Sequence, residues 1–228
     1  MTPDKAMSVA QRDKSGILLV DDHPIVREGL VQLINAEPDL VVCGEASTGR
    51  DAMNLIRSSD VDLALVDISL QDCSGVELIK DIVAVRATLP CIALSMYDEA
   101  LYAMRVLRAG GRGYIMKQEV PKKVLGAIRQ VLSGNVYLSE KMATRVVDQL
   151  FATDRAASRA DRELTDRELA VLMLIGRGLS TREIAEQLFL SVKTVESHCE
   201  RMKEKLNLKN RLELLRYAMQ FTFDATAR

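Results

Sequence analysis

Five short apolar runs alternate with five longer segments of helical periodicity between residues 17 and 132, and this alternation limits the fold more than any other feature of the chain. Apolar runs bounded by polar residues are typical of buried strands. The predicted strands cover 17–20, 40–43, 63–67, 91–95 and 113–116, and the predicted helices cover 24–36, 49–58, a segment from residue 75 onward, 99–109 and 121–132. Strands that alternate with helices form a parallel sheet with helices on both faces. We therefore predict a doubly wound α/β domain with a five-stranded parallel sheet over residues 16–133.

The rest of the chain has no strand pattern. Residues 1–15 are polar and are expected to form a disordered leader, and residues 134–162 are expected to form a helix (139–150) and a linker (152–160). Helical periodicity then predicts helices over 165–176, 181–188, 192–206 and 211–221. Ser180 with Glu183 three residues later is typical of a capping box at a helix start. We predict a small all-α domain over 163–222, followed by a tail over 223–228.

Charge and cysteine content exclude several classes of protein. The formal net charge is −1, but residues 16–133 carry 12 basic against 16 acidic side chains, and residues 193–216 carry 7 against 4. An acidic part followed by a mildly basic part indicates two domains with different partners. The four cysteines and two histidines lack the spacing of a zinc site. No apolar run approaches the about 18 to 20 residues of a membrane span, so we predict a cytoplasmic protein without membrane contact.

Polar side chains stand at the carboxyl ends of four predicted strands. Asp21 and Asp22 follow the first strand, and Asp67 ends the third. Ser95 ends the fourth strand and Lys117 follows the fifth. The carboxyl ends of parallel strands meet at one edge of a sheet, where ligands bind. Three carboxylates at one edge repel one another unless a cation lies among them, and oxygen donors suit Mg²⁺. A carboxylate beside Mg²⁺ and an ammonium group can act as a nucleophile in phosphoryl transfer.

Residues 17–133 resemble the receiver domain of bacterial two-component response regulators, which has a flavodoxin-like fold. The resemblance is carried by the segment Asp21-Asp22-His23-Pro24, by the strand-end Asp67, by Ser95, and by the run Gly113-Tyr114-Ile115-Met116-Lys117. It implies that a sensor histidine kinase phosphorylates Asp67. It also implies that Mg²⁺ is held by Asp67, by Asp22 directly, by Asp21 through water, and by the backbone carbonyl of Ser69.

The same resemblance implies a switch made of Ser95, Tyr114 and Lys117. Ser95 and Lys117 would contact the phosphoryl group, and the movement of Ser95 would open space for Tyr114 to rotate. Taken alone, Ser95 at a strand end is more often a turn residue, Tyr114 more often a core or edge aromatic, and Lys117 usually a solvated surface residue. His23 is expected to be structural. Gln71 stands where receivers often carry proline, which leaves the geometry of that loop open.

The helical domain resembles the LuxR-type output domain of NarL/FixJ-like regulators. The residues that carry this resemblance are Leu164-Thr165-Asp166-Arg167-Glu168, Gly178-Leu179-Ser180, Glu183-Ile184-Ala185, Leu188, Ser191-Val192-Lys193-Thr194-Val195, His198 and Lys205-Leu206. The helices over 181–188 and 192–206, joined by residues 189–191, form a helix-turn-helix whose second helix would enter a major groove. The resemblance implies binding of double-stranded DNA. The candidate contacts are Lys193, Thr194, Ser197, Arg201 and Lys205.

Two acidic residues in the predicted recognition helix leave alternatives open. Glu196 and Glu200 could oppose DNA phosphates, accept a hydrogen bond from cytosine N4, or pair with Lys193 and Lys203. An alternative function is therefore a receiver whose helical domain binds a protein, and this would lack the steep salt dependence of DNA binding.

An aspartyl-nucleophile phosphatase is a further alternative. Those enzymes carry a second Asp two residues after the nucleophile, and here Ser69 holds that position, so we predict no enzyme. The combined expectation is a phosphorylation-regulated transcription regulator that dimerises when Asp67 is modified. Its partners would be the kinase, DNA, a second copy of the chain and RNA polymerase.

Overall fold

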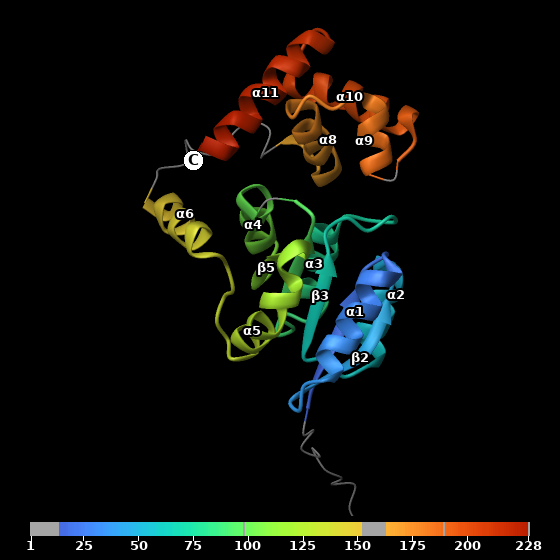
Figure 1. The fold of residues 1–228 in the computed structure, drawn as a ribbon, viewed down its shortest axis with the longest axis vertical. Coiled ribbons are helices and arrows are strands. Elements are labelled where there is room, and N and C mark those ends of the chain that lie inside the picture. Colours follow the sequence, from blue (N-terminus) through green and yellow to red (C-terminus); the bar gives the residue numbers. More distant parts are fainter. Residues whose placement is uncertain (1–13, 98, 152–162, 189, 228) are drawn as a thin grey trace, which may run out of the picture. The chain divides into compact units, whose positions relative to one another are not determined.

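The computed structural model describes residues 14–97, 99–151, 163–188 and 190–227. Contacts divide the chain into two compact units (Figure 1). The first unit comprises the residues up to 95 together with 109–137, and the second comprises 96–108 together with 138–228. Residues 1–13 of the predicted leader and the predicted linker over 152–160 lie outside the described residues. The expected end of the leader at residue 15 is wrong, because Ser15 already begins the first strand.

A parallel sheet forms the centre of the first unit and confirms the predicted fold class. Its strands are β1 (Ser15–Val20), β2 (Leu40–Ala46), β3 (Leu63–Asp67), β4 (Cys91–Ser95) and β5 (Gly113–Met116), in the spatial order β2-β1-β3-β4-β5. The order of the strands reverses at β1, because β1 lies between β2 and β3. Ligands of open α/β sheets bind beside such a switch point, at the carboxyl ends of the strands.

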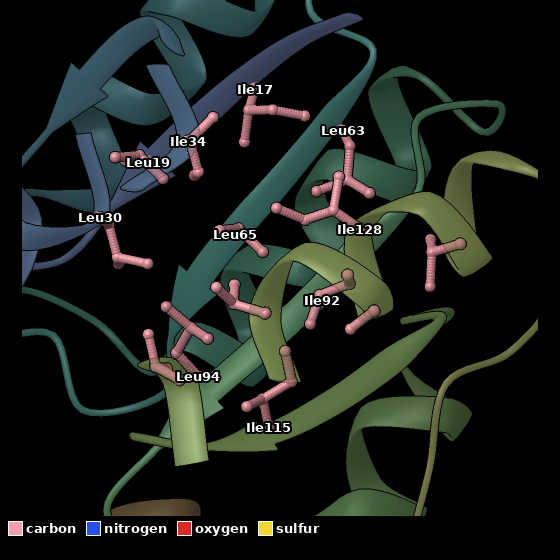
Figure 2. Packing of buried hydrophobic residues seen from close by; sticks show 14 of the residues in the cluster. Ile17, Leu19, Leu30, Ile34, Leu63, Leu65, Ile92, Leu94, Ile115 and Ile128 are labelled. Carbon is pink, nitrogen blue, oxygen red and sulfur yellow. The ribbon is translucent and has the colours of Figure 1, made fainter. Parts of the chain in front are cut away.

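Helices cover both faces of the sheet. In the first unit these are α1 (Pro24–Asn35), α2 (Gly49–Ser58), α3 (Gly75–Val85) and α5 (Val120–Leu132), which follows the short 3₁₀ helix η1 (Lys117–Glu119). Because side chains alternate along a strand, Ile17 and Leu19 of β1 face one side while Leu18 faces the other. Figure 2 shows the first side, where Leu30 of α1 and Ile128 of α5 lie over the strands. On the other side, α2 contacts β1 and β2, and α3 contacts β3 and β4. Burial of these aliphatic side chains stabilises the layers by about 1.5–3 kcal/mol for each large residue.

Strand β2 runs three residues beyond the predicted 40–43. Its pairing with β1 shifts register after Ile17, so that Leu18 pairs with Gly44 and Cys43 is the extra residue. The bulge lets Gly44 and Glu45 continue the ladder although they interrupt the apolar run. At the opposite edge, β5 gains a further bridge from Gly113 to Tyr137, which is why the first unit extends past residue 133.

Helices make up the second unit in the part of the chain that the structure describes. They are α4 (Glu99–Arg108), α6 (Glu140–Phe151), α8 (Asp166–Gly176), α9 (Thr181–Gln187), α10 (Val192–Leu206) and α11 (Arg211–Ala227). Reciprocal capping boxes begin α8 (Thr165 with Glu168) and α9 (Ser180 with Glu183), and Ser191 caps α10. Helices α8 and α11 pack so closely that a Cβ on Gly176 would lie 2.4 Å from the Ala218 carbonyl oxygen. No described helix is both long and apolar enough to cross a membrane.

Helix α11 differs most from its prediction. It continues six residues beyond the predicted end at Phe221, through most of the segment expected to be a tail. The segment 222–227 contains neither glycine nor proline and includes alanine, which favours helix, so nothing in it ends the helix.

Candidate functional site

Charged side chains from three strand ends meet at the carboxyl edge of the sheet. Asp67 is the last residue of β3, and Asp21 follows directly after β1. Lys117 follows directly after β5, and its Nζ lies 2.8 Å from Asp67 Oδ2 and 2.7 Å from Asp21 Oδ2. All three side chains are almost fully buried. The structure therefore brings together residues that lie up to 96 positions apart in the chain, as the strand-end pattern predicts.

The Asp67 carboxylate is buried and is surrounded by a few charged side chains. Burial raises the pKa of Asp67, and the neighbouring Lys117 ammonium acts against this rise. Burial alone would lower the pKa of Lys117, but the carboxylates of Asp67 and Asp21 outweigh it and raise the pKa instead. At neutral pH the ammonium is therefore charged, and it is the cation nearest to the Asp67 oxygens that the structure provides. A carboxylate held beside a fixed ammonium suits chemistry in which negative charge develops on a neighbouring oxygen.

The loop after Asp67 is closed tightly against the strand. The backbone N–H of Ser69 donates to Asp67 Oδ1 at 3.0 Å, and Gly75 N–H donates to the Ile68 carbonyl at 2.9 Å. A Cβ on Gly75 would lie 2.1 Å from the Asp67 carbonyl oxygen and 2.7 Å from Ile68 Cα. Glycine at 75 is therefore what allows α3 to begin so close to the end of β3.

Four side chains could hold a metal ion here. Asp21, Asp22, His23 and Asp67 each present a ligand atom, and these atoms all lie within 4.8 Å of one another. The buried Asp22 Oδ1 accepts no well-aligned hydrogen bond from the described residues, although His23 Nδ1 lies 2.7 Å away. Carboxylate oxygens are the donors that Mg²⁺ prefers. The three carboxylates therefore fit a hard divalent cation at the predicted place.

Ser95 and Tyr114 are both buried near this edge. Ser95 ends β4 and pairs with Met116, the residue before Lys117. Asp67 pairs with Leu94, so Ser95 follows the direct neighbour of Asp67 on the adjacent strand. Tyr114 lies on β5, and its side chain is buried. Their proposed switching roles stay predictions.

Two basic residues contact the acidic pair, and sequence reasoning missed the second. His23, which is expected to be structural, has its Nδ1 3.1 Å from Asp21 Oδ1 and 3.7 Å from Asp67 Oδ2. Arg27 was not singled out, and its Nη1 donates to the Asp21 carbonyl oxygen at 2.6 Å while its Nε lies 3.3 Å from Glu45 Oε2. Arg27 thus holds the backbone from which both acidic side chains extend. Arg27 lies one turn into α1, shortly after the acidic pair in the sequence, and this proximity could have pointed to the contact.

The second candidate site is the exposed face of α10. Val195, Met202 and Leu206 are buried and anchor the helix, which leaves Lys193 and Arg201 exposed. Of the other predicted contacts, Ser197 donates its hydroxyl to the Lys193 carbonyl at 2.9 Å, and Thr194 bonds Ser191. These hydroxyls already have partners within their own helix turn. Exposed cations on a helix that follows a short helix in the chain are what a DNA-binding helix-turn-helix presents.

Lys205 has a partner inside the protein. Its Nζ lies 2.6 Å from Glu168 Oε2, and Glu168 is only 2% exposed on α8. The same carboxylate accepts from Thr165 N–H in the capping box. The pair therefore ties the C-terminal end of α10 to the start of α8. A DNA contact by Lys205 stays a prediction and would have to coexist with this ion pair.

Lys205→Met is expected to lower the free energy of unfolding of the second unit by about 1–3 kcal/mol at pH 7, because it leaves the Glu168 carboxylate buried without its ammonium. Burial raises the pKa of Glu168, but the hydrogen bonds from Lys205 and Thr165 outweigh it, so the pKa lies below its ordinary value of 4.5. A lowered pKa stabilises the folded state above the ordinary value, and this contribution disappears as the pH falls through the folded-state pKa. Urea titrations at pH values from 7 downward should therefore show the stability difference between the two proteins shrinking once the pH falls below the ordinary value of 4.5, and disappearing below the folded-state pKa of Glu168. Lys193→Met, exposed on the same helix, is the control; an equal loss of stability there would contradict this account.

Family models match both parts of the chain. Residues 17–129 match the response regulator receiver domain, and residues 162–218 match the luxR family of bacterial regulatory proteins.

Curated proteins match nearly the full length. The chain is 36% identical to the oxygen regulatory protein NreC of Staphylococcus carnosus, covering 90% of this chain and 96% of NreC. It is 35% identical to the response regulator UvrY of Escherichia coli K12 (90% and 93% covered) and 33% identical to the uncharacterised transcriptional regulatory protein YxjL of Bacillus subtilis (92% and 97% covered).

Solved structures show the same likeness. RcsB from Salmonella enterica serovar Typhimurium, bound to the promoter rprA in the presence of the phosphomimetic BeF₃⁻, is 26% identical with a TM-score of 0.57, covering 90% of this chain and 98% of that chain. A LuxR-family two-component response regulator from Aurantimonas sp. SI85-9A1 is 29% identical with a TM-score of 0.56, covering 61% of this chain and 99% of that chain.

Proposed function

Since the chain belongs to the NarL/FixJ family of response regulators, with a receiver domain and a LuxR-type DNA-binding domain, we propose that phosphorylation of Asp67 controls its binding to DNA. The observation that carries this proposal is the buried Asp67 carboxylate, whose Oδ2 lies 2.8 Å from Lys117 Nζ beside the acidic pair after β1. The phosphoryl donor would be a phosphohistidine of a sensor kinase.

The residues of the site fit such a transfer. An Asp67 carboxylate oxygen would form the new bond to phosphorus while the phosphorus–nitrogen bond of the donor breaks, and the leaving imidazole would take up a proton. Lys117 would neutralise charge on the phosphoryl oxygens, and Ser95 would donate its hydroxyl to one of them. The aspartyl phosphate adds about two negative charges at the end of β3. This redistribution would move Ser95 and Tyr114. The covalent chemistry is confined to the chain's own aspartate, so no enzyme function is proposed.

Mg²⁺ would be held by the carboxylates of Asp21, Asp22 and Asp67 and by the Ser69 carbonyl. When bound, it supplies positive charge that offsets the three carboxylates and the phosphoryl oxygens. We expect Mg²⁺ to raise the thermal unfolding temperature of the wild type. At a Mg²⁺ concentration of about a hundred times Kd, the free energy of unfolding should rise by about 2.7 kcal/mol. Asp22→Asn should lose most of this gain, whereas Asp81→Asn, exposed on α3, should keep it. Calorimetry with and without Mg²⁺ checks this, and an equal gain in all three proteins would contradict the site.

Double-stranded DNA is the partner that we propose for α10. Support comes from the LuxR-type match over 162–218 and from the exposed Lys193 and Arg201. RcsB, a structural neighbour, has been solved on promoter DNA, and another structure contains two RcsB dimers on two DNAs. We propose that this chain also dimerises when phosphorylated, acts in the cytoplasm, and there meets the kinase, DNA and RNA polymerase.

Salt dependence distinguishes DNA from a protein partner. A dimer that makes about six to ten phosphate contacts should lose about a thousandfold or more in affinity between about 50 and 200 mM salt. Lys193→Ala should weaken binding to all sequences and flatten the salt slope by about one unit for each copy of the helix. Fluorescence anisotropy with duplex DNA at several salt concentrations measures both effects. An affinity for DNA that is absent or insensitive to salt would support the protein-partner alternative instead.

A further inference from the structure

One side of α10 is exposed from its first residue onward. Val192 begins the helix with 42% of its surface exposed, although it is apolar. Glu196 and Glu200 follow at intervals of four and are exposed as well. Residues four apart lie on the same face of a helix, so these three side chains form one stripe. The N-terminal part of a recognition helix is the part that contacts base edges.

The two acidic residues of this stripe differ in their partners. Glu200 Oε2 lies 2.8 Å from Lys203 Nζ, which confirms one of the pairings that the sequence suggested. Glu196 makes no hydrogen bond or ion pair with any residue that the structure describes, and Lys193 does not pair with it. One carboxylate is therefore balanced within the helix and the other is not. A bare carboxylate on a face that approaches phosphates weakens binding unless it meets a hydrogen-bond donor.

The hydrogen-bonding groups in the DNA major groove determine which base could donate a hydrogen bond to Glu196. A carboxylate only accepts hydrogen bonds. Guanine presents two acceptors in the major groove, and thymine presents an acceptor and a methyl group. Adenine combines a donor with an adjacent acceptor, which suits an amide side chain, whereas cytosine offers its N4 amino group alone and suits Glu or Asp. Cytosine is thus the base that Glu196 can bind without leaving an unfavourable contact.

We propose that Glu196 is a specificity-determining residue that selects cytosine at one position of the DNA site, by accepting a hydrogen bond from its N4 amino group. This inference rests on the proposed function and deepens it. Glu200, on the same stripe, differs in that its carboxylate already has Lys203 as a partner at 2.8 Å. Val192, one turn earlier on the same stripe, is 42% exposed and could meet a thymine methyl group at a neighbouring position of the groove.

The test uses the full chain with Mg²⁺ and beryllofluoride and a pool of DNA duplexes that contain a randomised segment. Wild type should enrich a site with an invariant cytosine, and replacement of that C·G pair should cost about tenfold or more in affinity. Glu196→Gln should lose this preference at that single position and shift it toward adenine, because an amide pairs with adenine N6 and N7. Its affinity for unrelated DNA should rise, since one negative charge is removed.

Glu200→Gln is the matched control and should keep the base profile of the wild type. A Glu196→Gln protein that binds every duplex more tightly with an unchanged base profile would overturn the inference, because Glu196 would then only oppose phosphates. A wild type that binds DNA with a normal salt slope but enriches no cytosine would also overturn it while leaving the proposed function intact. Failure of the wild type to bind any duplex would overturn both. Circular dichroism checks that each variant is folded.

Discussion

Asp67→Asn is expected to abolish phosphoryl transfer to this chain. The amide has the size of the carboxylate but no negative oxygen that can attack phosphorus, and the other acidic side chains cannot take its place. Asp21 is directed at Lys117 at 2.7 Å, and Asp22 lies against His23 at 2.7 Å. Incubation with acetyl phosphate and Mg²⁺, followed by intact-protein mass measurement, detects the added phosphoryl group. Wild type should gain one group, and the variant none.

Stability measurements separate loss of chemistry from loss of folding. Burial raises the pKa of Asp67, so the folded protein without metal disfavours the ionised carboxylate. A raised carboxyl pKa means that ionisation costs folding free energy, and this cost is largest above the folded-state pKa and vanishes below the ordinary value. The neutral side chain should therefore be at least as stable as the wild type at pH 7. Asp81→Asn should be phosphorylated normally. A phosphoryl group on the Asp67→Asn protein would contradict the assignment.

Gly75→Ala is expected to lower the free energy of unfolding of the first unit by about 3 kcal/mol. The new Cβ would lie 2.1 Å from the Asp67 carbonyl oxygen and 2.7 Å from Ile68 Cα. Both are backbone atoms of the central strand and its loop, so no side-chain rotation relieves the overlap. The loop after β3 must open, which also displaces Asp67, the proposed phosphoryl acceptor. The free energy of unfolding measured with urea and the rate of phosphoryl transfer should therefore both be lower in this variant.

Gly29→Ala provides the matched control. Gly29 lies in the middle of α1, and a Cβ there meets nothing within 4 Å. Alanine favours the helix over glycine by about 0.5–1 kcal/mol, so this variant should be slightly more stable and should be phosphorylated normally. Equal stabilities for the two alanine variants would show that the loop after Asp67 is not packed as the structure has it.

The sheet and its acidic edge could be predicted because two simple rules apply to them. Apolar runs of four or five residues locate the strands, and parallel pairing brings their ends together whatever their separation in sequence. Asp67 and Lys117 are 50 positions apart, yet each was identified by its place at the end of a strand. The exact length of β2 was not predictable in this way. Its last residues depend on a bulge opposite Ile17 and Leu18, and bulges leave no mark in the apolar pattern.

Contacts made by long basic side chains were the main omission. Arg27 reaches the Asp21 carbonyl, and Lys205 reaches a glutamate 37 positions away on another helix. Flexible side chains have many possible partners, and helical spacing predicts only the face of the helix on which each residue lies. For the same reason the sequence could not sort the residues of the recognition helix. The structure separates Glu200, which is paired with Lys203, from Glu196.

The most direct test of the central proposal is the equilibrium binding of the full chain to its enriched duplex, with and without beryllofluoride and Mg²⁺. Light scattering on the same samples measures the mass of the protein. Wild type should change from monomer to dimer and bind DNA more tightly when beryllofluoride and Mg²⁺ are added. Asp67→Asn should show neither response. An equal response in the variant, or no response in the wild type, would contradict control of DNA binding through Asp67.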